Sequence, residues 1–186
     1  MGYKVMALCP WEERAAMSEL YLLRHAKAVP QGGIMRDTDR PLEERGRAGA
    51  RAVAKYLQRQ KIAPELILCS PALRTRETLN LVVEGVALAP QIEYENVLYL
   101  ASAERLLERI RELPDAIERV MLVGHNPGLH ELAQWLADGT TGPLADKLAT
   151  NLATAGLVRF EVNIEWSGLR RRTARLVALV TPKDLE

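Results

Sequence analysis

Three short apolar segments of this chain each run directly into residues that can bind a phosphate group. They are residues 21–23 before Arg24 and His25, residues 66–69 before Ser70 and Arg74, and residues 120–123 before His125 and Asn126. Short apolar runs that precede helical patterns are typical of buried parallel strands. Because the carboxyl ends of such strands line one crevice of an open α/β sheet, we expect the polar groups to meet there.

The rest of the chain supports an α/β fold in which helices cover a largely parallel sheet. Apolar residues recur at helical spacing after each of the three segments, and a weaker strand is expected at residues 91–94. Ser70-Pro71 and Asn126-Pro127 are typical helix starts, a capping residue followed by proline. Residues 157–164 and 173–180 alternate like strands, which predicts a terminal antiparallel hairpin.

Length and charge narrow the class of protein. The chain has 186 residues, a length that favours one domain. We expect this domain over residues 17–186. Residues 1–16 would then form an N-terminal extension whose role the sequence does not define. A net charge of +1 argues against a general nucleic-acid or membrane surface, and we interpret the basic run at residues 170–172 as solvated. With two cysteines and no membrane-spanning stretch, we expect a cytoplasmic protein.

The grouped side chains suit phosphoryl transfer. A phosphoryl group carries about −1.5 to −2 charges near neutral pH, and the planar forks of Arg24 and Arg74 match its oxygens. A neutral imidazole is available as a nucleophile at pH 7. We expect that nucleophile to be His25, which leaves a strand end beside Arg24, with His125 stabilising the developing charge. This chemistry needs no metal or other cofactor.

Each of these residues also has a purely structural interpretation. A lone histidine at a strand end is more often a hydrogen-bonded structural residue, and an arginine in a first helical turn is usually a solvated charge. We interpret His130, five residues after His125, as structural. The functional interpretation rests on four groups falling at the same end of predicted parallel strands.

The same motifs resemble those of a known family. Residues 22–26 (LLRHA), 70–78 (SPALRTRET) and 123–128 (VGHNPG) are similar to the motifs of the histidine phosphatase superfamily, in particular its small bacterial branch typified by the phosphohistidine phosphatase SixA. Residues 39–42 and 153–155 also resemble that branch. The resemblance extends from about residue 19 to the C-terminus.

The resemblance implies a fold, a reaction and a site. The implied fold is a three-layer, phosphoglycerate mutase-like sandwich with a mostly parallel mixed sheet and no cap domain. It implies that His25 becomes phosphorylated, that Arg24, Arg74 and His125 complete the phosphate pocket, and that the backbone at Asn126 faces the phosphate. Larger members also carry an acidic proton donor, and three carboxylates are conceivable here. They are Glu95, Asp39 and Asp37.

The leading expectation is therefore a metal-independent phosphatase of protein phosphohistidine, because an imidazole leaving group needs a proton donor less than an alkoxide does. The second hypothesis is that the protein is a phosphatase of a small phosphorylated metabolite. A non-catalytic phosphate- or phosphoprotein-binding module is the third. Nucleic-acid binding through residues 170–172 is disfavoured by the near-neutral charge. The oligomeric state is not predicted.

Overall fold

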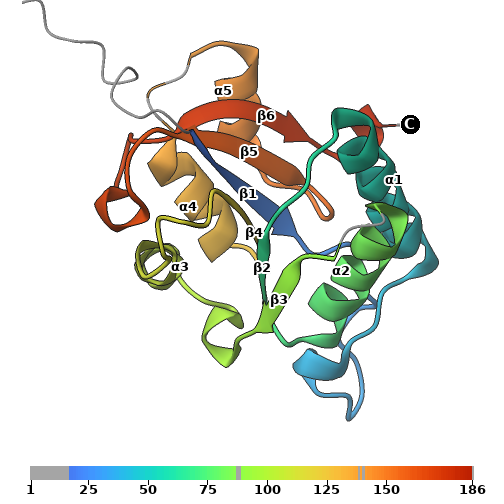
Figure 1. Ribbon diagram of the computed structural model, residues 1–186. Coiled ribbons are helices and arrows are strands. Elements are labelled where there is room, and N and C mark those ends of the chain that lie inside the picture. The colour runs from blue at the N-terminus through green and yellow to red at the C-terminus, as the bar shows by residue number, and fades with distance from the viewer. Residues whose placement is uncertain (1–16, 87–88, 138, 140, 186) are drawn as a thin grey trace, which may run out of the picture.

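A single mixed sheet organises the chain. The structure, a computed structural model, describes residues 17–86, 89–137, 139 and 141–185. Six strands lie in the order β3-β2-β4-β1-β5-β6 (Figure 1). Their bounds are β1 Ser18–Arg24, β2 Leu66–Cys69, β3 Gln91–Tyr94, β4 Arg119–Gly124, β5 Leu157–Val162 and β6 Arg175–Val180.

Parallel pairing in register brings three strand ends to one level. β1 pairs with β4 in parallel, with Arg24 opposite Gly124, and β2 pairs with β4, with Cys69 opposite Val123. β5 and β6 continue the sheet in antiparallel fashion on the other side of β1. Residues 25, 70 and 125, which follow β1, β2 and β4, therefore leave the sheet side by side.

Two helical layers cover the sheet, because its strands bury both faces. In β1, Leu20 and Leu22 face one core and Tyr21 and Leu23 the other. The first core is packed by α3 (Ala103–Arg111), α4 (Gly128–Leu136) and α5 (Pro143–Thr150), and the second by α1 (Glu44–Gln60) and α2 (Leu73–Val86). Figure 1 shows these two groups of helices on opposite sides of the sheet. The predicted three-layer α/β sandwich is confirmed.

The helix starts expected at Ser70-Pro71 and Asn126-Pro127 are not observed, whereas another capping residue, Ser102, does begin a helix. Ser102 caps α3 as a helix-start residue, accepting a hydrogen bond from the Arg105 N–H at 3.4 Å. The prediction that Ser70-Pro71 opens a helix is wrong, because α2 begins at Leu73. The same holds for Asn126-Pro127, where the peptide bond is cis and α4 begins at Gly128. Asn126 lines the cavity described below, and Ser70 bonds His125, another residue of that cavity wall.

The terminal hairpin is confirmed, but its connection is longer than the expected turn. β5 ends at residue 162 and β6 begins at residue 175, and the connection contains a short 3-10 helix, Trp166–Gly168. The Trp166 side chain is fully buried, and its Nε1–H donates to the Ile117 carbonyl at 2.8 Å. A large buried indole with a satisfied N–H anchors this connection to the core.

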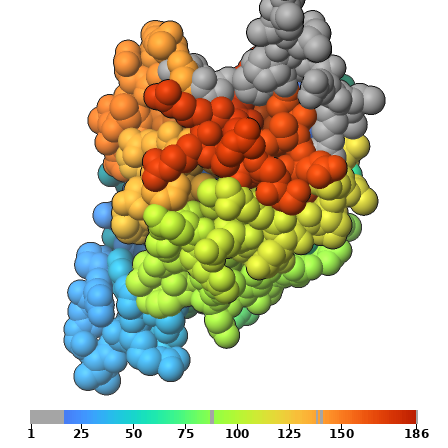
Figure 2. All heavy atoms as spheres, turned by 90° about the vertical axis from the view of Figure 1, so that its left-hand side faces the viewer, coloured from blue at the N-terminus to red at the C-terminus, as the bar shows by residue number. Residues whose placement is uncertain are grey.

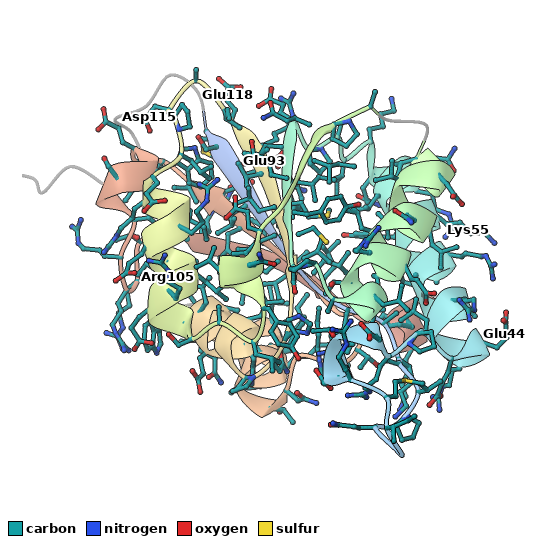
Figure 3. All side chains as sticks on the ribbon, turned by 90° about the horizontal axis from the view of Figure 1, so that it is seen from below. Glu44, Lys55, Glu93, Arg105, Asp115 and Glu118 are labelled. Atoms are coloured by element: carbon teal, nitrogen blue, oxygen red, sulfur yellow. The ribbon has the colours of Figure 1, made fainter. Side chains whose placement is uncertain are left out.

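Charged residues occupy the outer surface. Figure 3 shows Glu44 and Lys55 on the outer side of α1, away from the sheet. The segment that follows β1, blue in Figure 2, projects from the body of the molecule and carries the short 3-10 helix Asp37–Asp39. No helix in the described ranges is long and apolar enough to cross a membrane. The expected extension, residues 1–16, lies outside the described residues.

Close backbone contact at the start of α4 gives a test of the fold. A methyl group on Gly128 would lie 2.0 Å from the Ala101 carbonyl oxygen, so backbone would have to move. We expect Gly128→Ala to lower the free energy of unfolding by at least about 2 kcal/mol, measured by urea denaturation. Gly32→Ala is the matched control, because nothing lies within 4 Å of its added carbon. A Gly128→Ala protein as stable as this control would contradict the described packing.

Candidate active site

The groups expected to meet do line one cavity. It has a volume of about 490 Å³ and lies at the carboxyl ends of β1 and β4. All five predicted site residues contribute to its wall. The lining residues are Arg24, His25, Lys27, Ala28, Gln31, Asp37, Arg40, Arg74, Tyr99, Leu100, His125, Asn126 and Thr154.

His25 presents a defined nitrogen to this cavity. Its Nδ1 lies 2.8 Å from the Ala26 carbonyl oxygen, which can only accept a hydrogen bond, so Nδ1 carries the proton. Burial, helped by the nearby Arg74 and Arg24 cations, lowers the pKa of His25 to about 4. At neutral pH the ring is therefore uncharged, and the free lone pair is on Nε2. A neutral imidazole with an available nitrogen is a competent nucleophile.

His125 lies against His25, with ring centroids 5.2 Å apart. Its Nε2 is 2.8 Å from the Ser70 hydroxyl oxygen, whereas its Nδ1 is buried without a hydrogen-bond partner among the described residues. Burial, followed by the neighbouring Arg74 cation, lowers the pKa of His125 to about 3. If the Ser70 hydroxyl donates to Nε2, the neutral ring carries its proton on Nδ1 and can donate it to an anion.

The two arginines are held in different ways. Arg24 donates from Nη1 to the Leu152 carbonyl at 2.7 Å. Arg74 is almost fully buried and donates two hydrogen bonds to Asp37. Its Nη1 is 2.6 Å from the Asp37 carbonyl oxygen, and its Nη2 is 2.8 Å from the Asp37 carboxylate. Each guanidinium is thus fixed at the cavity wall by contacts to another segment of the chain.

Three buried side-chain atoms lack a hydrogen-bond partner within the described residues, and all three belong to this cavity wall. They are Arg24 Nε, His125 Nδ1 and Asn126 Oδ1. A buried polar atom without a partner costs about 1–3 kcal/mol, and such atoms are rare in folded proteins. Two of the three are donors or can be, so the cavity wall is suited to binding an anion.

The three candidate proton donors differ in position. Only Asp37 lines the cavity, where its carboxylate accepts from Tyr99 (2.5 Å), Arg40 (2.7 Å) and Arg74. These bonds, that of Tyr99 first, hold the pKa of Asp37 well below its usual range, so it stays ionised. Asp39 pairs with Arg36 and Glu95 with Arg109, both away from the cavity wall.

Tyr99 and Arg40 line the cavity but were not assigned to it from the sequence, and the contact that Ser70 makes was not foreseen. Ser70 was interpreted as a helix cap, and its actual partner His125 is 55 positions away along the chain. Tyr99 follows the 3-10 helix Asn96–Leu98 and packs edge-on against His125 at 5.5 Å between ring centroids. Neither contact leaves a local sequence signal. His130, interpreted as structural, bonds the Leu148 carbonyl at 2.6 Å and does not line the cavity.

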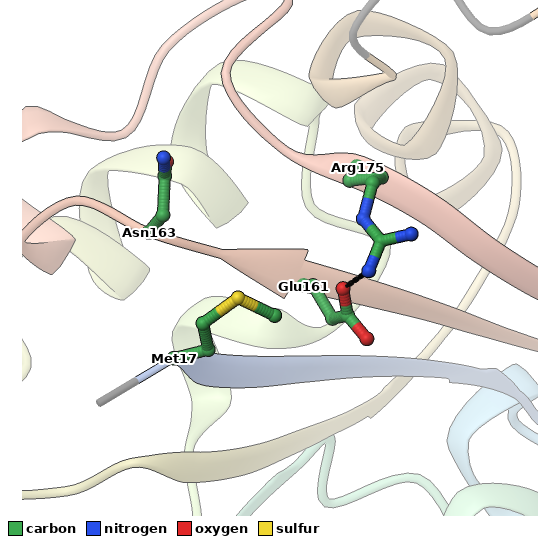
Figure 4. Close-up of a pocket in the computed structure, with 4 residues that line it drawn as sticks. All are labelled: Met17, Glu161, Asn163 and Arg175. Atoms are coloured by element: carbon green, nitrogen blue, oxygen red, sulfur yellow. Dashed lines mark hydrogen bonds and ion pairs between the residues drawn. The ribbon is translucent and has the colours of Figure 1, made fainter. Parts of the chain in front are cut away.

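Another cavity of the described structure lacks the groups that catalysis of phosphoryl transfer requires. It has a volume of about 300 Å³ and is lined by Met17, Glu161, Asn163 and Arg175, with Glu161 and Arg175 paired to each other (Figure 4). It contains no nucleophile. Among the described residues, no three His, Cys, Asp or Glu side chains gather as a potential metal site.

Comparison with known proteins identifies the family. The profile described as histidine phosphatase superfamily (branch 1) matches residues 20–98. The chain belongs to this superfamily, a class of phosphatases, and within it resembles SixA.

Relatives match across most of the chain. Uncharacterized protein ML1117 of Mycobacterium leprae is 32% identical over 165 residues, covering 87% of this chain and all of that protein. Phosphohistidine phosphatase SixA of Escherichia coli is 27% identical over 128 residues, 68% of this chain and 78% of SixA. A solved structure from Nakamurella multipartitia, provisionally named phosphohistidine phosphatase SixA, has a TM-score of 0.79 at 26% identity, covering 91% of this chain and 99% of its own.

The histidine environments predict an unusual titration. We expect the rings of His25 and His125 to stay neutral as the pH falls from about 8 to about 5, because their pKa values are lowered to about 4 and about 3. Nitrogen-15 NMR should also find the proton of His25 on Nδ1. Bound vanadate should raise both pKa values, since an anion stabilises imidazolium. A midpoint near the ordinary value of about 6.5 for His25 would contradict the described burial.

Proposed function

We propose that this protein is a metal-independent phosphatase that removes the phosphoryl group from phosphohistidine in proteins, through a covalent phosphohistidine at His25. The observation that carries the proposal is the set of buried polar atoms, without a partner among the described residues, in the wall of the cavity that His25 lines, above all Arg24 Nε and His125 Nδ1. A phosphoryl group seated against His25 would supply the acceptors that these two atoms lack.

In the first step, the Nε2 lone pair of His25 attacks phosphorus. The new P–Nε2 bond forms as the bond from phosphorus to the substrate imidazole breaks, and the departing ring nitrogen takes a proton from solvent. Arg24, Arg74 and His125 Nδ1–H stabilise the charge on the three phosphoryl oxygens. The hydrogen bond from Nδ1–H to the Ala26 carbonyl stabilises the positive charge that develops on the His25 ring.

In the second step, water attacks the phosphorus atom of phosphorylated His25. The P–O bond forms, the P–Nε2 bond breaks, and both hydrogens of the water leave with the product as dihydrogen phosphate. His25 returns to the neutral ring with its proton still on Nδ1. Neither step uses a metal.

The leaving group decides between substrate classes. Among the described residues, Asp37 is the one carboxylate in the cavity wall, and it stays ionised because it accepts three hydrogen bonds. It is therefore a poor proton donor to an alkoxide, which leaves badly without one. An imidazole can leave after taking a proton from water, which favours phosphohistidine. The names of the SixA relatives agree with this choice.

A small phosphorylated metabolite is the second candidate substrate. The cavity volume of about 490 Å³ falls in the range of small-ligand sites, roughly 300–1,000 Å³, and would admit one. A panel of a phosphohistidine protein, sugar phosphates and nucleotides, followed by phosphorus NMR, separates the two. Faster turnover of any metabolite than of the phosphohistidine protein would make a small phosphorylated metabolite the leading candidate substrate.

The nucleophile is tested by substitution. We expect His25→Ala to lower turnover of phosphoramidate by at least about 10³-fold and to abolish a phospho-enzyme that survives alkali but is lost in acid. Activity of the unchanged protein should persist in EDTA and be inhibited by vanadate. Binding of phosphate without turnover or a trapped phospho-enzyme would favour the non-catalytic phosphate-binding module instead.

The matched control is His130→Gln. His130 bonds a backbone carbonyl outside the cavity, and glutamine keeps a donor for that contact. It should retain close to full activity. Equal losses in His25→Ala and His130→Gln, with both proteins folded, would refute the assignment of His25.

A further inference from the structure

A second cavity adjoins the candidate active site. It has a volume of about 560 Å³ and is formed by the first turns of α1, the segment before β5 and the short 3-10 helix Pro182–Asp184. Lys27 and Thr154 line both cavities, so the two cavities are neighbours that share part of their walls. We call the second cavity the α1 recess. Its lining residues are Lys27, Arg45, Gly46, Ala48, Gly49, Ala52, Ala153, Thr154, Ala155, Thr181, Pro182 and Lys183.

The floor of the α1 recess is made of small residues. A methyl group on Gly49 would lie 3.2 Å from Pro182 Cγ and 3.6 Å from Ala155 Cβ, so the three elements meet closely at this point. Glycine and alanine dominate the α1 side of the wall. Small side chains leave the volume open, and the long side chains at its margin are cationic.

The charges of this chain are segregated at the two cavities. The whole chain has 25 Lys and Arg against 24 Asp and Glu. In the part of the chain that the structure describes, however, six cationic side chains and a single carboxylate, that of Asp37, line the two cavities. The six are Arg24, Lys27, Arg40, Arg45, Arg74 and Lys183.

One phosphoryl group does not account for all of this positive charge. Arg40 and Arg74 pair with Asp37, and Arg24 and Arg74 face the phosphoryl position. Lys27, Arg45 and Lys183 make no ion pair with any carboxylate in the described part of the chain, and no carboxylate lines the α1 recess. Unpaired cations around a cavity that adjoins the phosphoryl position attract a ligand with further negative charge.

We propose that the α1 recess is a second anion-binding subsite, which takes carboxylate side chains that flank the phosphohistidine in the protein substrate. This inference rests on the proposed function and names the kind of protein segment that the site prefers. Arg45 and Lys183 form the distal part of the subsite, and Lys27 lies between it and the phosphoryl position. The near-neutral net charge of the chain means that this preference is local rather than a property of the whole surface.

Matched peptides test the preference directly. One phosphohistidine peptide carries three glutamates on each side of the phosphohistidine, a reach of about 10 Å, and the other carries glutamines. We expect kcat/KM for the glutamate peptide to be at least about tenfold higher at low ionic strength, mainly through KM, and the advantage to shrink with added salt. Equal values for the two peptides would overturn the subsite.

Charge reversal locates the preference. We expect Arg45→Glu with Lys183→Glu to remove the advantage of the glutamate peptide while hydrolysis of phosphoramidate stays within about twofold. Arg59→Glu makes the same type of change on α1 outside both cavities and should keep the preference. Loss of the preference in Arg59→Glu as well would assign it to overall charge and refute the subsite.

The two proposals fail in different ways. Hydrolysis of both peptides at one rate, with phosphoramidate also hydrolysed, would remove the subsite and leave the phosphatase. No hydrolysis of either peptide or of phosphoramidate by the unchanged protein would remove both.

Discussion

The candidate site depends on the parallel register of three neighbouring strands. β1, β4 and β2 end at one level, with Arg24 opposite Gly124 and Cys69 opposite Val123. The residues that follow these strands therefore lie together at one edge of the sheet. Apolar packing on both faces of these strands fixes that register, because a slip of one residue would exchange the side chains of the two cores and place Tyr21 and Leu23 where Leu20 and Leu22 pack. The geometry of the cavity is therefore a consequence of core packing.

The cost of gathering so many cations is offset by specific contacts. Asp37 binds Arg40, Arg74 and Tyr99, and the Leu152 carbonyl accepts from both Arg24 and Asn126. Both histidines respond to the same surroundings by staying neutral, which leaves one ring nitrogen as a nucleophile. Within the described residues, the buried side-chain atoms without a hydrogen-bond partner all belong to this cavity wall, and an anionic ligand would supply the partner of the donors among them.

The α1 recess extends this reasoning from the phosphoryl group to the rest of the substrate. The reacting groups sit at strand ends, where backbone position is fixed, whereas Arg45 and Lys183 lie on a helix and on the short helix after β6. In this proposal, phosphoryl transfer and substrate preference depend on residues of two neighbouring cavities.

The sequence by itself determined the strand–helix alternation, the order of the elements and the placing of His25, Arg24, Arg74, His125 and Asn126 at one edge, because apolar periodicity is a local signal. Only the tertiary structure decided that Ser70 bonds His125 rather than capping a helix, that Tyr99 reaches the site, and that Asp37 rather than Asp39 or Glu95 lines the cavity. These contacts join residues dozens of positions apart. Their geometry depends on how loops pack, which no local pattern records.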